Sequence, residues 1–169
     1  TVQSNSGNIS LTGTINVKGK DCAICAGDEN VVGDVTINGD LTAETTGNKY
    51  FCIVGKKVTL IGGTMKITSV TNAVVSYGDM ILGGDITASA TDDRSGAFNT
   101  RDGGNLFIQE GSTITAASAG FGIYAAGNIT MPNGSLTARG YSNATVQSNS
   151  GNISLTGTIN VKGKDCAIC

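Results

Sequence analysis

Residues 7–17 read GNISLTGTINV, two short alternations of apolar and polar residues separated by Gly13. Within each alternation the apolar residues are spaced two apart, as Ile9 and Leu11 are. Period-two alternation is typical of β-strands that bury one face, and glycine adopts the backbone angles that sharp corners need. The stretch therefore predicts two short strands joined at a glycine corner, with their apolar side chains on one side.

The same pattern recurs along the whole chain. Alternating stretches begin at Ile9, Val35, Val58, Met80, Leu106, Ile129 and Ile153. Each repeat, of about 24 residues, has a turn containing Gly or Asn-Gly between its first two strands, and then a polar loop and a third short strand. The inward-facing residues of the third strands are predicted to be Ile24, Ile53, Val75, Phe98, Ile123 and Val146.

Three short strands in each repeat predict an all-β fold, a right-handed parallel β-helix (β-solenoid) of about seven coils without caps. The handedness follows from the general preference of parallel crossovers. No segment has the apolar spacing of a helix. A β-sandwich is the alternative all-β architecture, but it does not explain why the repeats match one another.

A longer repeat encloses the short one, because residues 1–25 and residues 145–169 have the same sequence. The chain is thus expected to be one continuous solenoid segment, residues 1–169, containing one super-repeat (residues 1–144) and the start of the next (residues 145–169). Uncapped coil edges invite pairing, so we expect the solenoid to continue with further copies, covalently or by end-to-end stacking, and to bundle laterally.

Composition narrows the classes of function. The net charge is −2 and only 14% of residues are charged, which gives no indication of nucleic-acid binding. There is no run of apolar residues long enough to insert into a membrane. The 25 glycines, the single proline and the Thr- and Ser-rich polar positions agree with an extracellular or cell-surface solenoid.

The units GNISLTGTINVKG, GDVTINGDLTAE and GNITMPNGSLTARG resemble the coils of right-handed parallel β-helices in large surface proteins. Similar coils occur in adhesin-like proteins of bacteria and methanogenic archaea, and in a carbohydrate-binding β-helix family of clostridial cell surfaces. The resemblance covers the whole chain and implies a surface location with an adhesive, scaffolding or polysaccharide-binding role. It assigns no functional residue, because the matching positions are core and corner positions.

Three cysteines occur in each period, Cys22, Cys25 and Cys52. A metal site would need a second cysteine or histidine pair, and a redox site of the thioredoxin type would need a helix. Cys25 and Cys52 align on neighbouring coils, so an inter-coil disulfide between them is one prediction, with Cys22 left as a core thiol or a link to another chain. The alternative is that all three are thiols packed in the solenoid.

Glycosylation sequons occur at Asn8, Asn128, Asn133 and Asn143, and these are candidate sites in an exported protein. The acidic pairs Asp92-Asp93 and Asp28-Glu29 are interpreted as solvated loops, since adjacent carboxylates seldom make a hydrolytic pair. Asp34, Asp40, Asp79 and Asp85 flank strand starts and are interpreted as turn formers.

No catalytic residue, cofactor or metal ligand is predicted, and the chain is not expected to be an enzyme. Tyr50, Tyr77 and Tyr124 are candidates for related faces on different coils, which would suit sugar binding. The sequence thus favours a structural repeat of an extracellular filament or long surface protein, with self-association as the main interaction. The alternative is a polysaccharide-binding adhesin module.

Overall fold

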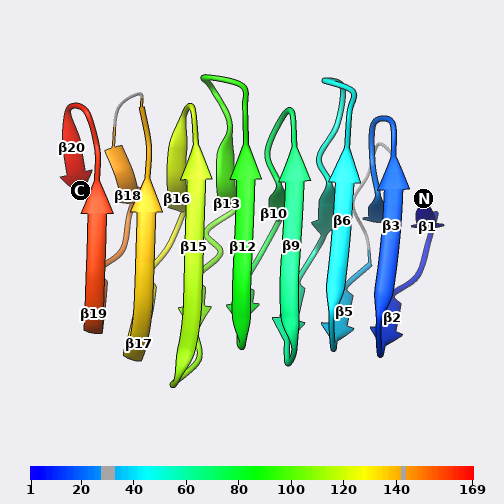
Figure 1. The fold of residues 1–169 in the computed structure, drawn as a ribbon, viewed down its shortest axis with the longest axis horizontal. Helices are drawn as coiled ribbons and strands as arrows, with labels where there is room; N and C mark the ends of the chain where they lie inside the picture. Colours follow the sequence, from blue (N-terminus) through cyan, green and yellow to red (C-terminus); the bar gives the residue numbers. More distant parts are fainter. Residues whose placement is uncertain (28–32, 142–143) are drawn as a thin grey trace.

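The computed structural model describes residues 1–27, 33–141 and 144–169. Within these residues the chain is all β, without helices, and forms a parallel β-solenoid of about seven turns of about 23 residues each. The turns lie side by side along the long axis, with the two ends of the chain at opposite ends of the molecule (Figure 1). The predicted all-β parallel solenoid is confirmed.

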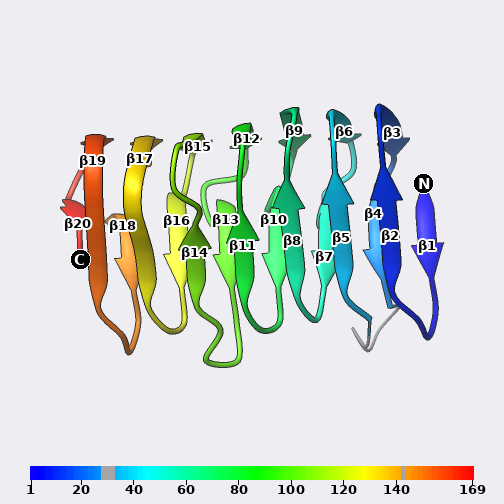
Figure 2. The same cartoon turned by 90° about the horizontal axis from the view of Figure 1, so that it is seen from below.

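The first face of the solenoid is a parallel sheet of eight strands. In spatial order they are β1 (Val2–Ser4), β4 (Ile24–Ala26), β7 (Ile53–Gly55), β10 (Val74–Ser76), β13 (Gly96–Thr100), β16 (Phe121–Ala125), β18 (Ala144–Ser148) and β20 (Cys166–Ile168). Each strand hydrogen-bonds to the equivalent strand of the next coil, so the strands of this face stack along the long axis (Figure 2).

The second and third faces belong to one sheet of twelve strands. The second face contains β2 (Ile9–Thr12), β5 (Val35–Asn38), β8 (Val58–Ile61), β11 (Met80–Leu82) and β14 (Leu106–Ile108). The third face contains β3 (Ile15–Gly19), β6 (Leu41–Thr45), β9 (Thr64–Ser69), β12 (Asp85–Ala90) and β15 (Ser112–Ser118). The two faces merge because β17 (Ile129–Arg139) pairs with both β14 and β15, and β19 (Ile153–Lys162) pairs with β17.

The strand register reproduces the repeat found in the sequence. The residues aligned in successive coils of the second face are Ile9, Val35, Val58, Met80, Leu106, Ile129 and Ile153. These are the same residues that begin the alternating stretches of the sequence. Coils of unequal length therefore keep one register, because the extra residues lie in the corner loops between faces.

One apolar core runs through the described coils. Ile37, Leu60 and Leu82 are stacked in it and are fully buried. Among the third-strand residues predicted to face inward, the prediction for Val75 is wrong. The register places Val74 in line with Ile53, so Val74 faces the core and Val75 faces outward.

The corner between the second and third faces is built from glycines in most coils, as predicted, but the turn predicted at Asn133-Gly134 is wrong, because β17 runs unbroken through it. Positive φ angles occur at Gly13, Gly39, Gly62, Gly63, Gly84, Gly111 and Gly157. At Gly39 (φ 135°) an added Cβ would lie 2.3 Å from the carbonyl oxygen of Gly13 in the preceding coil. Glycine is therefore needed there both for its backbone angles and for the close approach of the coils.

The corner between the first and second faces carries a ladder of Asn and Asp side chains. In five places a side-chain oxygen accepts a hydrogen bond from the backbone N–H of the next coil, at 2.8–3.2 Å: Asn8 from Asp34, Asp34 from Lys57, Asp79 from Asn105, Asn105 from Asn128 and Asn128 from Asn152. The ladder satisfies corner N–H groups that the sheets do not reach.

The second copy of the repeated segment docks on the sixth coil as one more coil. β19 pairs with β17 from Ile153 opposite Ile129 to Lys162 opposite Arg139, and β18 pairs with β16. Within the second copy Val146 pairs with Ile168, just as Val2 pairs with Ile24 in the first. The junction between the two periods is thus made by parallel strand pairing, with one register shift between Met131 and Gly134.

Candidate functional site

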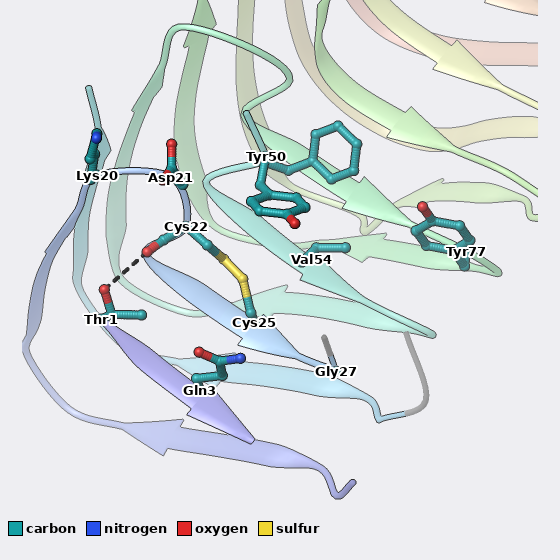
Figure 3. A pocket seen from close by; sticks show the side chains of 11 residues that line it. Thr1, Gln3, Lys20, Asp21, Cys22, Cys25, Gly27, Tyr50, Val54 and Tyr77 are labelled. Atoms are coloured by element: carbon teal, nitrogen blue, oxygen red, sulfur yellow. Dashed lines mark hydrogen bonds between the residues drawn. A yellow bond between two sulfur atoms is a disulfide. The ribbon is translucent and has the colours of Figure 1, made fainter. Parts of the chain in front are cut away.

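A groove of about 380 Å³ lies on the first face near the amino-terminal end of the chain. Tyr50, Val54 and Tyr77 line one side of it, and the disulfide of Cys22 and Cys25 lines the other (Figure 3). These residues come from three successive coils, so the stacking of the solenoid assembles the groove.

The floor of the groove is an apolar cluster on the outer side of the sheet. Cys25, Val54 and Val75 stand in register on neighbouring strands and point away from the core. All three are nevertheless at least nine-tenths buried. Burial arises because Phe51 and Tyr77, together with Cys22, pack over them.

Arg101 closes one end of this cluster. Its guanidinium carbon lies 4.9 Å from the centroid of the Phe51 ring and 5.2 Å from that of Tyr77. The same guanidinium donates a hydrogen bond to the Tyr77 hydroxyl at 3.1 Å. Cation–π contacts of this kind fix the orientation of aromatic rings, so Arg101 holds this wall of the groove in place.

The rim of the groove carries both signs of charge. Lys20 and Asp21 lie at the corner loop of the first coil and line the groove. Lys49 places its ammonium group 4.9 Å from the centroid of the Tyr50 ring. Aromatic walls with a charged rim can bind a ligand that presents both an apolar face and polar groups.

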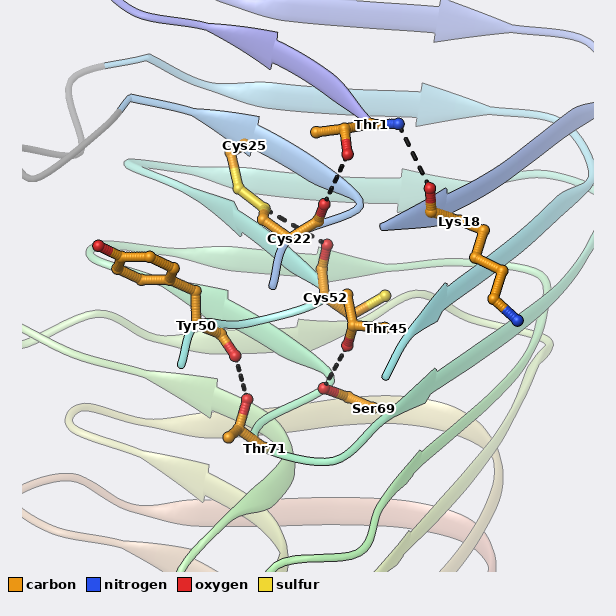
Figure 4. The surroundings of a disulfide bond; sticks show 9 residues. All are labelled: Thr1, Lys18, Cys22, Cys25, Thr45, Tyr50, Cys52, Ser69 and Thr71. Carbon is orange, nitrogen blue, oxygen red and sulfur yellow. Dashed lines mark hydrogen bonds between the residues drawn. A yellow bond between two sulfur atoms is a disulfide. The ribbon is translucent and has the colours of Figure 1, made fainter. Parts of the chain in front are cut away.

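The cysteine pairing differs from the prediction. Cys22 bonds to Cys25 with a Cα–Cα distance of 6.4 Å (Figure 4), and the second copy repeats this bond with Cys166 and Cys169. The predicted Cys25–Cys52 bond is wrong, because Cys25 points outward while Cys52 points into the core. Cys22 is therefore half of a surface disulfide, neither a core thiol nor a link to another chain.

Cys52 is a free, fully buried thiol. Burial raises the pKa of the Cys52 thiol from 9.0 to about 12, and a hydrogen bond with Thr45 offsets only part of this. Thr45 in turn shares a 2.8 Å hydrogen bond with Ser69 of the next coil. A thiol in this state is inert, so Cys52 serves as a small core residue.

We expect Cys52 of the folded protein to react at least about a hundredfold more slowly with iodoacetamide at pH 8 than it does in denaturant, because burial keeps the reagent from the thiol and raises its pKa. Mass spectrometry of timed, quenched samples measures both rates. Equal native and unfolded rates at pH 8 would contradict the buried placement, and Cys52→Ala gives the background.

The predicted glycosylation sites fall in different surroundings. Asn8 and Asn128 belong to the corner ladder, and Asn128 also donates its amide nitrogen to Asn105 at 3.0 Å. That amide nitrogen is the atom that would carry a glycan. Asn133 is exposed beside the corner of β17, whereas Asn143 lies outside the described residues. Glycosylation stays a prediction at all four, with Asn133 the best presented of those described.

The tyrosines are only partly brought together. Tyr50 and Tyr77 line the groove, whereas Tyr124 lies further along the first face, with its ring centroid 5.6 Å from that of Phe121. Phe51 and Arg101 were not among the predicted site residues. Phe51 could have been found, because it is adjacent in sequence to the candidate Tyr50. Nothing in the sequence pairs Arg101 with two aromatic rings from earlier coils.

Two absences among the described residues concern metal binding and membrane-spanning helices. Among the described residues, no cluster of three or more His, Cys, Asp or Glu side chains is placed to hold a metal ion. No helix in the described part of the chain has the length and hydrophobicity of a membrane span. The acidic pair Asp92-Asp93 lies in an exposed corner loop between β12 and β13, and the Asp28-Glu29 pair lies outside the described residues.

Comparison of the chain with protein-family models, with curated proteins and with solved structures gave no match. The resemblance to adhesin-like and carbohydrate-binding surface proteins therefore stays a prediction.

Proposed function

We propose that this chain is a non-catalytic structural repeat of an extracellular filament or a long cell-surface solenoid protein. The observation that carries the proposal is the junction of the two periods, where β19 continues the stack by pairing with β17 along its length. A repeat that joins to its own copy through its own core is suited to building length.

The exposure of identical residues in the two copies supports this proposal. Ile24 is fully buried because the following coil places Ile53 against it. Ile168, the same residue in the second copy, is 43% exposed. The rest of the second period would cover Ile168 with the equivalent of Ile53, so each added copy would extend one apolar core and leave no new apolar surface between periods.

The proposed location is outside the cell. The surface disulfide of Cys22 and Cys25 recurs in each copy, and such bonds persist in oxidising compartments. The proposed partner is another copy of this repeat, before or after it along the solenoid. No nucleic acid or membrane interior is proposed as a partner.

Electron cryomicroscopy of the native protein at the cell surface tests this proposal. We expect unbranched rods with layers about 4.8 Å apart and a longer repeat of about 29 Å, the rise of six coils. Compact particles about one period in length would contradict it.

The alternative function is a polysaccharide-binding adhesin module, and the aromatic groove is the observation that favours it. In that case Tyr50→Ala should weaken binding to a glycan selected from a broad panel about tenfold, as expected for loss of one stacked ring, whereas Tyr124→Ala should not. A flat response of the unmodified chain to the whole panel would rule out this function.

A further inference from the structure

A second hollow, of about 170 Å³, lies at the opposite end of the chain. Arg139, Tyr141 and Lys164 line it at the corner between the third and first faces. Tyr141 is 69% exposed, the most exposed large apolar side chain among the described residues.

Each of the two hollows is lined by the same lysine of the repeated segment. Lys164 is the copy of Lys20, which lines the groove at the first coil. If one period follows another, as the proposed function requires, Arg139 and Tyr141 of the first period lie on one side of Lys20. Tyr50 then lies on its other side. The two hollows would then meet at Lys20, and we name their facing residues the junction groove: Arg139, Tyr141, Lys20, Asp21 and Tyr50.

The junction groove combines aromatic walls with an excess of positive charge. Tyr141 and Tyr50 occupy the same corner two coils apart, a separation of about 10 Å. Arg139 and Lys20 line the groove, and Asp21 is the acidic residue among its five members. Lys49 adds a further positive charge beside Tyr50. The neighbouring Lys18 is already paired with Glu44 at 3.0 Å.

The same edge of the solenoid carries an acidic projection, the loop of residues 91–95 between β12 and β13. The connections after β12 and β6 project furthest at this edge (Figure 1). The side chains of Asp93 and Arg94 are 83% and 89% exposed, and they lie 3.8 Å apart. Asp92 accepts a hydrogen bond from the Arg94 backbone at 2.9 Å, which fixes the shape of the loop.

Groove and loop are half a period apart. Lys20 lies at the corner of the first coil and residues 91–95 at the same corner of the fourth coil, in a period of six coils. Two parallel arrays offset by half a period would therefore bring each loop opposite a groove on the partner. The same offset places the long 46–52 connection of one array opposite the short 119–120 connection of the other. The shapes of the two edges are therefore complementary.

We propose that the 91–95 loop of a second copy docks in the junction groove and holds two solenoids together edge to edge. Asp92 and Asp93 then meet Lys20 and Arg139, while Arg94 meets the tyrosine rings and Asp21. Arginine over a tyrosine face and carboxylates beside cations are complementary pairs. Each contact is weak because it is exposed, but it recurs in every period along the array.

A chain extended to three periods tests the proposal, with sedimentation velocity measured at low and high salt. We expect laterally paired rods at low salt that separate at high salt. Replacing Asp92 and Asp93 by lysine in every period should weaken pairing at least tenfold, and so should Lys20→Glu together with Arg139→Glu. Combining the two sets of changes should restore pairing. Asp85→Lys, an exposed charge change at the start of β12, should leave pairing unchanged.

The length of the rods, measured in the same samples, separates this proposal from the proposed function. Rods of full length that stay single at low salt would overturn lateral docking and leave the filament intact. Pairing that survives the lysine substitutions, or a groove that binds an added soluble glycan while the rods stay single, would also overturn it. Particles shorter than a continuous solenoid would overturn the proposed function.

Discussion

Leu60→Ala is expected to destabilise the protein by about 3 kcal/mol. Leu60 is fully buried, with Ile37 stacked on one side and Leu82 on the other. Truncating it removes apolar contact with both neighbouring coils and leaves a cavity that the rigid strand spacing cannot close. Urea unfolding followed by circular dichroism measures the loss.

Leu11→Ala is the matched control, because Leu11 holds the same position in the first coil. It pairs with Ile37 on one side, is only partly buried, and has no coil on its other side in this chain. We expect a cost of about 1 kcal/mol, half the Leu60 effect or less. Equal costs at the two positions would mean that burial does not come from stacking of coil on coil.

Gly39→Ala should destabilise the protein by about 2–4 kcal/mol. The new Cβ would lie 2.3 Å from the Gly13 carbonyl oxygen, and the φ of 135° is unfavourable for alanine. Since the corner carbonyl belongs to a neighbouring coil, relief requires the two coils to separate locally. Thermal unfolding should show a lower midpoint.

Gly103→Ala separates the two causes of that cost. Gly103 also has a positive φ, 78°, but an added Cβ meets nothing within 4 Å. Only backbone strain remains, and we expect about 1 kcal/mol. If Gly39→Ala costs no more than Gly103→Ala, the close approach at the corner does not contribute to stability.

The coil pattern could be predicted from the sequence because it depends on local rules. Alternation fixes which residues of a strand face the core, and glycine marks the corners, so the register from Ile9 to Ile153 followed from sequence alone. The same rules could not decide between Val74 and Val75. Three apolar or small residues in a row satisfy either phase, and only pairing with Ile53 selects Val74.

The cysteine pairing and the groove depended on the paths of loops. Cys52 lies one residue before β7, where the corner turns it into the core, and sequence alignment of Cys25 with Cys52 could not detect that turn. The groove gathers side chains from several coils, including Phe51 and Tyr77, and the guanidinium that lies over these two rings comes from Arg101 of a further coil. Spacing within one coil carries no information about such contacts.

Because the two copies have identical sequences, differences in burial between them come from the neighbouring coils. Residues 1–25 and 145–169 form strands over similar stretches, although β2 and β3 of the first copy correspond to the single strand β19 of the second, yet Ile24 is buried and Ile168 is exposed. The strand structure is therefore set by the coil itself, and its burial is set by the neighbouring coil. This is the behaviour of a one-dimensional array, in which stability grows by interfaces between neighbours.

The most direct test of the account is the length of the molecule as a function of the number of periods. Chains of one, two and three periods would be measured by small-angle X-ray scattering, with conditions chosen to keep them single. If the periods stack as one continuous solenoid, each added period should lengthen the rod by about 29 Å without changing its cross-section. Particles that instead grow in width, or that scatter as flexibly linked separate bodies, would contradict it.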